Sequence, residues 1–177
     1  MPTLAGQVVR VKDGDTVVVQ FEDSGSQTRG ARETVRLGGI DAPEKGQPYG
    51  PAATRAMQKL AGGKAVTVDV QTRGPYGRLI GRVQTPRYDV GRSMVHNGYA
   101  WADRKNGHTR RLLALENRAR QEEKGLWARD RPTAPWRWRS TAGQRKRSNL
   151  ASGLLWIVGT AMATVLLFAV LVALAAA

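Results

Sequence analysis

Short apolar runs alternate with polar turns through the first half of the chain. Five runs are rich in β-branched residues and partly alternate between apolar and polar positions, as half-buried strands do. We therefore expect strands over residues 7–12, 15–22, 33–40, 65–71 and 78–84. The first two runs are joined through Asp13 and Gly14, a pair typical of tight turns, which predicts an antiparallel hairpin.

Three later segments have helical patterns. Residues 50–63 place Pro51 near the start and a glycine pair at the end, which is the usual punctuation of a helix. A shorter helix is expected over 90–98 and a longer one over 108–125, where apolar residues recur at helical spacing. Because no helix separates the first three strands, we expect an α+β fold built on a small closed barrel.

The last segment has a different pattern. Residues 153–177 contain no charged residue and no Pro, Asn or Gln. As a helix this segment would be about 37 Å long, which exceeds the ~30 Å apolar core of a bilayer. A buried core helix is the alternative, but such helices are seldom so long and apolar on every side. We therefore expect a single membrane-spanning anchor.

Residues 128–152 lie between the predicted domain, residues 1–127, and the predicted anchor. They carry Trp136, Trp138 and a cluster of Lys and Arg, and they have no apolar period. Such a linker suits the membrane interface and the positive-inside rule, so we expect the domain to face the cytoplasm. A basic arm that binds nucleic acid is the alternative interpretation.

The net charge and the numbers of cysteine and histidine residues limit the partners and the reaction chemistry that this chain could have. The chain has 28 Lys and Arg against 14 Asp and Glu, a formal charge of +14. This excess favours polyanions or anionic membrane surfaces as partners. Cysteine is absent, which excludes disulfides, thiolate metal sites and a cysteine nucleophile. With only two histidines, a zinc site is poorly supplied.

Two acidic motifs are candidates for a functional site. Asp13 and Asp15 flank a glycine in the predicted hairpin, and Asp41 and Glu44 bracket Ala-Pro after the third predicted strand. Each motif alone has an ordinary explanation in turn or loop chemistry. Together they supply the hard oxygen ligands that Ca²⁺ or Mg²⁺ prefers, and a further carboxylate able to activate water.

Arginines are the second component of the candidate site. Arg36 precedes Asp41 by five positions, so strict alternation would point their side chains to opposite faces of a strand. Gly38 and Gly39 lie between them, where a bulge or sharp bend costs little. Arg78 follows a Gly- and Pro-rich turn and is a second candidate cation, with a solvated strand-end arginine as the alternative.

Four ordered motifs and two shorter ones resemble the staphylococcal nuclease (thermonuclease-like) domain. They are VVRVKDGDTV, VRLGGIDAPE, QPYGPAA and PYGRLIGRV, with GYAW and KGLW after them. The resemblance spans residues 6–127 and implies a five-stranded OB-fold-like barrel with three helices. It also implies a Ca²⁺-dependent phosphodiesterase that hydrolyses DNA and RNA and leaves 3′-phosphate ends.

The resemblance further implies a metal site and a group that acts on water. Asp15 and Asp41 correspond to the carboxylate ligands of Ca²⁺, and the backbone carbonyl of Ala42 to a third ligand. Glu44 corresponds to the residue that positions or deprotonates the attacking water. Asp13 matches an acid close to the metal but not bound to it.

The remaining matches concern the substrate. Arg36 and Arg78 correspond to the two guanidinium groups that hold the scissile phosphate. Tyr76 corresponds to an aromatic residue suited to stacking on a base or contacting the sugar, and a packing role is the alternative. A family tyrosine that contacts the nucleotide phosphate has no clear counterpart in this chain.

Two other hypotheses belong to different functional classes. The same fold in eukaryotic coactivator proteins binds nucleic acid or modified peptides, with its acidic and arginine positions eroded. The first is therefore a catalytically silent nucleic-acid-binding module tethered to a membrane. Here all five core side chains are present, which favours catalysis. The second is a membrane-surface scaffold whose basic face meets lipid headgroups.

Overall fold

The computed structural model describes most of the chain outside its C-terminal segment. The described residues are 2–22, 30–74, 77–104, 110–129 and 131–141. The chain forms two compact units, Met1–Pro135 and Trp136–Ala177. The predicted anchor, residues 153–177, lies outside the described residues. Within them, no helix combines the length and the apolar character needed to cross a bilayer.

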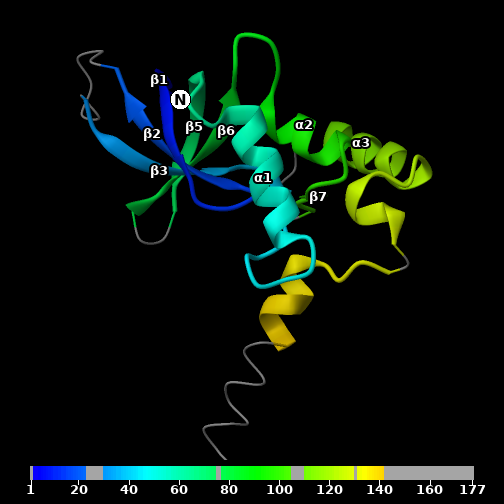
Figure 1. The fold of residues 1–177 in the computed structure, drawn as a ribbon. Helices are drawn as coiled ribbons and strands as arrows, with labels where there is room; N and C mark the ends of the chain where they lie inside the picture. The colour runs from blue at the N-terminus through cyan, green and yellow to red at the C-terminus, as the bar shows by residue number, and fades with distance from the viewer. Residues whose placement is uncertain (1, 23–29, 75–76, 105–109, 130, 142–177) are drawn as a thin grey trace, which may run out of the picture. The chain divides into compact units, whose positions relative to one another are not determined.

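A closed five-stranded barrel forms the body of the first unit (Figure 1). Its strands are β1 (Thr3–Val11), β2 (Thr16–Phe21), β3 (Arg32–Leu37), β5 (Ala65–Arg73) and β6 (Leu79–Gln84). Their order is β1-β2-β3-β6-β5, with β3 and β6 parallel and every other pair antiparallel. The predicted barrel is confirmed. Alternating apolar residues fill its interior, for example Val17, Val19 and Phe21 of β2.

The three predicted helices are also confirmed. They are α1 (Gly50–Ala61), α2 (Val90–His96) and α3 (Arg110–Gln121). A proline occupies the first turn of α1 and Gly62 caps its end. The carboxylate of Asp89 caps α2 by accepting the backbone N–H of Arg92 at 2.9 Å. Helix α2 packs against both α1 and α3 to one side of the barrel (Figure 1).

Some short elements have no counterpart in the sequence pattern. Strand β4 (Ile40–Asp41) pairs with β7 (Trp101–Ala102), and η2 (Gly125–Ala128) is a 3₁₀ turn. Strand β1 begins at Thr3, earlier than expected, because its first residues pair with β5. Strands of two residues, such as β4 and β7, have no measurable period, so only their pairing with distant segments defines them.

The first compact unit reaches beyond the end of the predicted domain. Ala134 is buried beside Trp101, Trp127 and Ala119. The side-chain amide of Gln47 donates to the carbonyl of Thr133 at 2.6 Å. Part of the segment expected as a linker therefore packs on the domain, and residues 135–141 are helical.

Candidate active site

The turn between β1 and β2 carries the first acidic motif. The backbone N–H of Lys12 donates to the carbonyl of Thr16 at 2.9 Å, which closes the predicted hairpin. Asp13 accepts the N–H of Asp15 at 3.1 Å and orders the turn. A side chain at Gly14 would lie 2.7 Å from the Cβ of Ala42. The glycine therefore permits close packing of this turn on the second acidic motif.

Arg36 brings the two acidic motifs together. Its Nη1 lies 2.7 Å from Asp15 Oδ1, and its Nη2 lies 2.9 Å from Asp41 Oδ1. The chain turns at Gly38 and Gly39 between β3 and β4, and Gly39 has a φ of +80°, a conformation that favours glycine. The predicted bend at the glycine pair is confirmed, and it places Asp41 on the side of Arg36.

The two carboxylates are deeply buried. Asp15 is 4% exposed and Asp41 is 6% exposed. Asp15 also accepts the hydroxyl of Thr16 at 2.9 Å and the backbone N–H of Ala42 at 3.0 Å. Burial raises the pKa of Asp15 from 3.8 to about 6, against the opposing charge of Arg36 and with a further rise from Asp13. The buried negative charge is therefore incompletely balanced by this arginine.

These residues fit a hard divalent cation. Arg36 supplies one positive charge to two buried carboxylates, while Asp13 adds negative charge nearby. Ca²⁺ binds carboxylate, backbone carbonyl and water oxygens. The carboxylates of Asp15 and Asp41 and the backbone carbonyl of Ala42 are therefore ligands of a suitable type. The described residues contain no group of three or more His, Cys, Asp or Glu side chains that could hold a metal. Some ligands would therefore be backbone or water oxygens.

Glu44 lies in the loop between β4 and α1 and is half-buried. Its backbone N–H donates to the side chain of Gln47 at 3.1 Å, and its carbonyl accepts the N–H of Gln47 at 2.9 Å. Gln47 is 3% exposed and holds this loop in place. Sequence reasoning missed Gln47, and its spacing of three residues from Glu44 was the only available signal.

Arg78 lies directly before β6, beside the strand that carries Arg36. Strands β3 and β6 pair in parallel, with Arg36 opposite Ile80. Arg78 lies two positions before Ile80, so period-2 alternation places Arg78 and Arg36 on the same outer face of the barrel. The Nε of Arg78 is buried without a hydrogen-bond partner among the described residues. Tyr76, the other predicted substrate contact, lies outside the described residues.

Comparison with known proteins shows which proteins this chain is similar to. A family model described as "Staphylococcal nuclease homologue" matches residues 34–129. An "Uncharacterized endonuclease" from Escherichia coli O157:H7 is 44% identical over 135 residues, which cover 76% of this chain and 84% of that protein. A "Micrococcal nuclease" from Shigella flexneri is 35% identical over 147 residues, covering 76% and 79%.

A plant relative is similar over a smaller region. A "Staphylococcal-like nuclease CAN1" from Arabidopsis thaliana is 39% identical over 105 residues, which cover 59% of this chain and 32% of that longer protein. The matched family region includes Arg36, Asp41, Ala42, Glu44 and Arg78. The chain therefore belongs to the staphylococcal nuclease family.

Proposed function

We propose that this protein is a Ca²⁺-dependent nuclease that hydrolyses phosphodiester bonds in DNA and RNA and leaves 3′-phosphate ends. The observation that carries the proposal is the two-pronged contact of Arg36 with Asp15 and Asp41. This contact gathers acids and a guanidinium from three separate segments at one point. Membership of the staphylococcal nuclease family supports the same reaction class.

The chain's own residues supply most of the chemistry. Asp15, Asp41 and the carbonyl of Ala42 are proposed to hold Ca²⁺, which when bound supplies Lewis-acid polarisation of the phosphate. Glu44 takes a proton from the attacking water. As water attacks phosphorus, the bond to the 5′ oxygen breaks, and that oxygen leaves as a hydroxyl after taking a proton from solvent.

The two arginines act on the charge that builds up during attack. The phosphoryl oxygens gain negative charge as the new bond forms, so Arg36 and Arg78 stabilise the transition state more than the substrate. The Arg36 side chain is 23% exposed, so it can contact a phosphate while its acid contacts fix its position. The buried Nε–H of Arg78 gains an acceptor when a phosphate binds.

The test is cleavage of single-stranded DNA and RNA by the full-length chain. We expect cleavage with Ca²⁺, its loss with EDTA, and products with 3′-phosphate ends. Asp41→Asn should abolish the Ca²⁺ response, whereas Asp103→Asn provides a control at a different acidic residue. Tight binding of nucleic acid without cleavage would instead support the catalytically silent module.

We also propose that residues 153–177 anchor the nuclease in a membrane, with the domain on the cytoplasmic side. The support is the uncharged apolar sequence of this segment and the Lys and Arg cluster that precedes it. A reporter fused to the N-terminus and assayed for its compartment tests the orientation. An external N-terminus would contradict it.

A further inference from the structure

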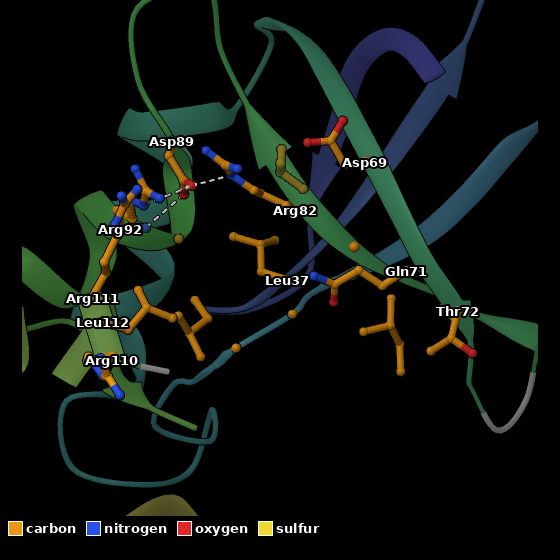
Figure 2. A pocket seen from close by; sticks show the side chains of 17 residues that line it. Leu37, Asp69, Gln71, Thr72, Arg82, Asp89, Arg92, Arg110, Arg111 and Leu112 are labelled. Carbon is orange, nitrogen blue, oxygen red and sulfur yellow. Dashed lines mark hydrogen bonds and ion pairs between the residues drawn. The ribbon is translucent and has the colours of Figure 1, made fainter. Parts of the chain in front are cut away.

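A pocket of about 1000 Å³ opens between the barrel and the helices. It is formed by the turn between β3 and β4, by β5 and β6, and by α2 and the start of α3 (Figure 2). Leu37–Ile40, the turn segment, lines the pocket. Arg36 directly precedes this segment and Asp41 directly follows it. The pocket is therefore next to the candidate active site, and none of the proposed catalytic or metal-binding residues lines it.

The lining of the pocket as a whole has an excess of positive charge. Four arginines and two aspartates line it, namely Arg82, Arg92, Arg110, Arg111, Asp69 and Asp89. Asp89 pairs with the Nε atoms of Arg82 and Arg92 at 2.7 and 3.5 Å. Asp69 accepts hydrogen bonds from the side chains of Thr3 and Gln84. Both carboxylates therefore already have ion-pair or hydrogen-bond partners within the protein.

Arg110 and Arg111 supply the charge that these acids do not balance. Both are exposed at the start of α3, and neither side chain has a hydrogen bond or ion pair within the described part of the chain. Figure 2 shows both on the same side of the pocket as Arg92, with Gln71 and Thr72 of β5 opposite. A ligand that enters the pocket therefore meets Arg92, Arg110 and Arg111 on one side, and on the other the polar residues of β5, whose one carboxylate, Asp69, already accepts two hydrogen bonds.

Two glycines keep the pocket open. A side chain at Gly38 would collide with the side chain of Gln71, and one at Gly39 would lie 3.0 Å from Leu112 Cδ1. The lining beside them is apolar and includes Leu37. An apolar floor with a cationic wall suits a nucleotide, whose sugar and base are less polar than its phosphate.

The outer face of β6 leads from the candidate active site to this pocket. Leu79 and Val83 are buried in the barrel, so Arg78 and Arg82 lie on its outer face. Four residues of strand span about 13 Å, and Asp89 holds the Arg82 guanidinium on the side of α2. A single phosphate contacted by Arg78 therefore leaves the arginines of the pocket available for another phosphate of the same strand.

We propose that this pocket binds the part of the nucleic-acid strand next to the scissile phosphate, with Arg110 and Arg111 contacting a flanking backbone phosphate. The inference rests on the proposed nuclease function. It adds that the protein binds the strand beyond the scissile phosphate, partly through sequence-independent phosphate contacts. Longer substrates should consequently bind better than those that end at the cleaved bond.

The test compares two double variants of the full-length chain. Arg110→Ala/Arg111→Ala removes the unbalanced pocket charges. Arg55→Ala/Lys59→Ala removes the same charge from exposed positions on α1. Binding of a fluorescent single-stranded dodecanucleotide and of a trinucleotide is measured by anisotropy in EDTA over a range of salt concentrations. Thermal melting confirms that each variant is folded.

We expect the pocket variant to bind the dodecanucleotide about tenfold more weakly, which corresponds to the removal of one charge-assisted hydrogen bond. The plot of log affinity against log salt should become less steep by about 0.7 for each phosphate that the variant no longer neutralises. The trinucleotide should show a smaller decrease in affinity. Arg110→Lys/Arg111→Lys should restore most of the binding, because a phosphate also accepts a point charge.

Equal decreases of affinity and salt slope in the pocket and α1 variants would overturn the assignment of the pocket. Cleavage with Ca²⁺, measured on the same samples, separates this failure from that of the proposed function. A wild-type chain that binds but never cuts overturns the proposed nuclease activity. The anisotropy result in EDTA then still decides whether the pocket holds the strand.

Discussion

Arg36 shows how one residue determines the geometry of the candidate site. Its guanidinium contacts Asp15 of the first hairpin and Asp41 at the end of β4. Such charge-assisted contacts are stronger than neutral hydrogen bonds and fix orientation through the planar guanidinium group. The phosphate-binding role proposed for Arg36 therefore depends on the same contacts that keep the two acids together.

Replacing Arg78 with lysine tests its proposed role. Arg78→Lys keeps the charge but loses the planar fork that can contact two phosphate oxygens. We expect kcat to fall on the order of 10³-fold with unchanged thermal melting. Arg73→Lys, at the other end of the same turn and half-exposed, is the matched control and should retain activity. Near-normal turnover of Arg78→Lys would remove this residue from the mechanism.

Asp15 gives a prediction about pH in the absence of metal. Because burial raises its folded-state pKa from 3.8 to about 6, the folded protein holds this proton more tightly than the unfolded chain. The resulting contribution to stability is present below about pH 4 and is lost as the pH rises through about 6. The loss is about 3 kcal/mol for a shift of about two pKa units.

Urea denaturation in EDTA measures this effect. Asp15→Asn cannot ionise, so its free energy of unfolding should fall less than that of the wild type between about pH 4 and pH 7. Added Ca²⁺ should stabilise the wild type at the upper end of this range, because a cation favours the ionised carboxylate. Parallel pH profiles for the two proteins would contradict the assignment of the shift to Asp15.

At the scale of elements, helix α3 supports the strand that carries Asp41. Glu116 is 1% exposed, and its Oε2 accepts the backbone N–H of Ala102 in β7 at 2.8 Å. Its Oε1 accepts two N–H groups of Arg120 at 3.0 and 2.7 Å. Strand β7 pairs with β4, with Trp101 opposite Asp41. The helix is thereby linked to a proposed metal ligand.

Two ion pairs with the same i,i+4 spacing, one within α3 and one that spans its C-terminal end, allow a matched comparison. Glu116→Gln weakens the buried contacts to Arg120, so we expect a loss of about 2 kcal/mol in the free energy of unfolding. It should also weaken Ca²⁺ affinity by displacing β7 and β4. Glu122→Gln changes an exposed pair with Arg118 at the same spacing and should have little effect. Equal effects of the two variants in urea denaturation would show that burial does not distinguish these pairs.

At the scale of the whole molecule, charge and apolarity are separated along the chain. The formal charge of +14 lies entirely before the uncharged segment, residues 153–177. A positive surface increases the rate at which polyanions are encountered, and an anchor would confine that encounter to the membrane surface. If the proposed anchor inserts, these two properties together predict a nuclease that acts on nucleic acid near a membrane.

Cell fractionation tests the proposed anchor. The full-length chain should remain in the membrane pellet after an alkaline carbonate wash, because a spanning helix is held by its apolar length rather than by charge. Deletion of residues 153–177 should move the protein to the soluble fraction. Release of the full-length chain by high salt alone would indicate attachment through the basic surface.

Much of the barrel and part of the site could be predicted without the structure. Each β-branched run has one face that must be buried whichever strand pairs with it, so the five barrel strands follow from the local pattern. Strict alternation alone would have sent Arg36 and Asp41 to opposite faces, and the glycine pair between them was the sequence signal for the bend that brings them together. Gln47 could not be found in this way, because its role depends on the fold of the loop around Glu44.

The sequence by itself determined the order of strands and helices, the supply of carboxylates and arginines, and the separation of charge from the apolar C-terminal segment. These features depend on residues close together in the chain. Only the tertiary structure decided the pairing of β4 with β7, the burial of Glu116 beneath it, and the pocket beside Gly38. Each of these features depends on contacts between segments distant in the chain, and a local sequence pattern does not predict such contacts.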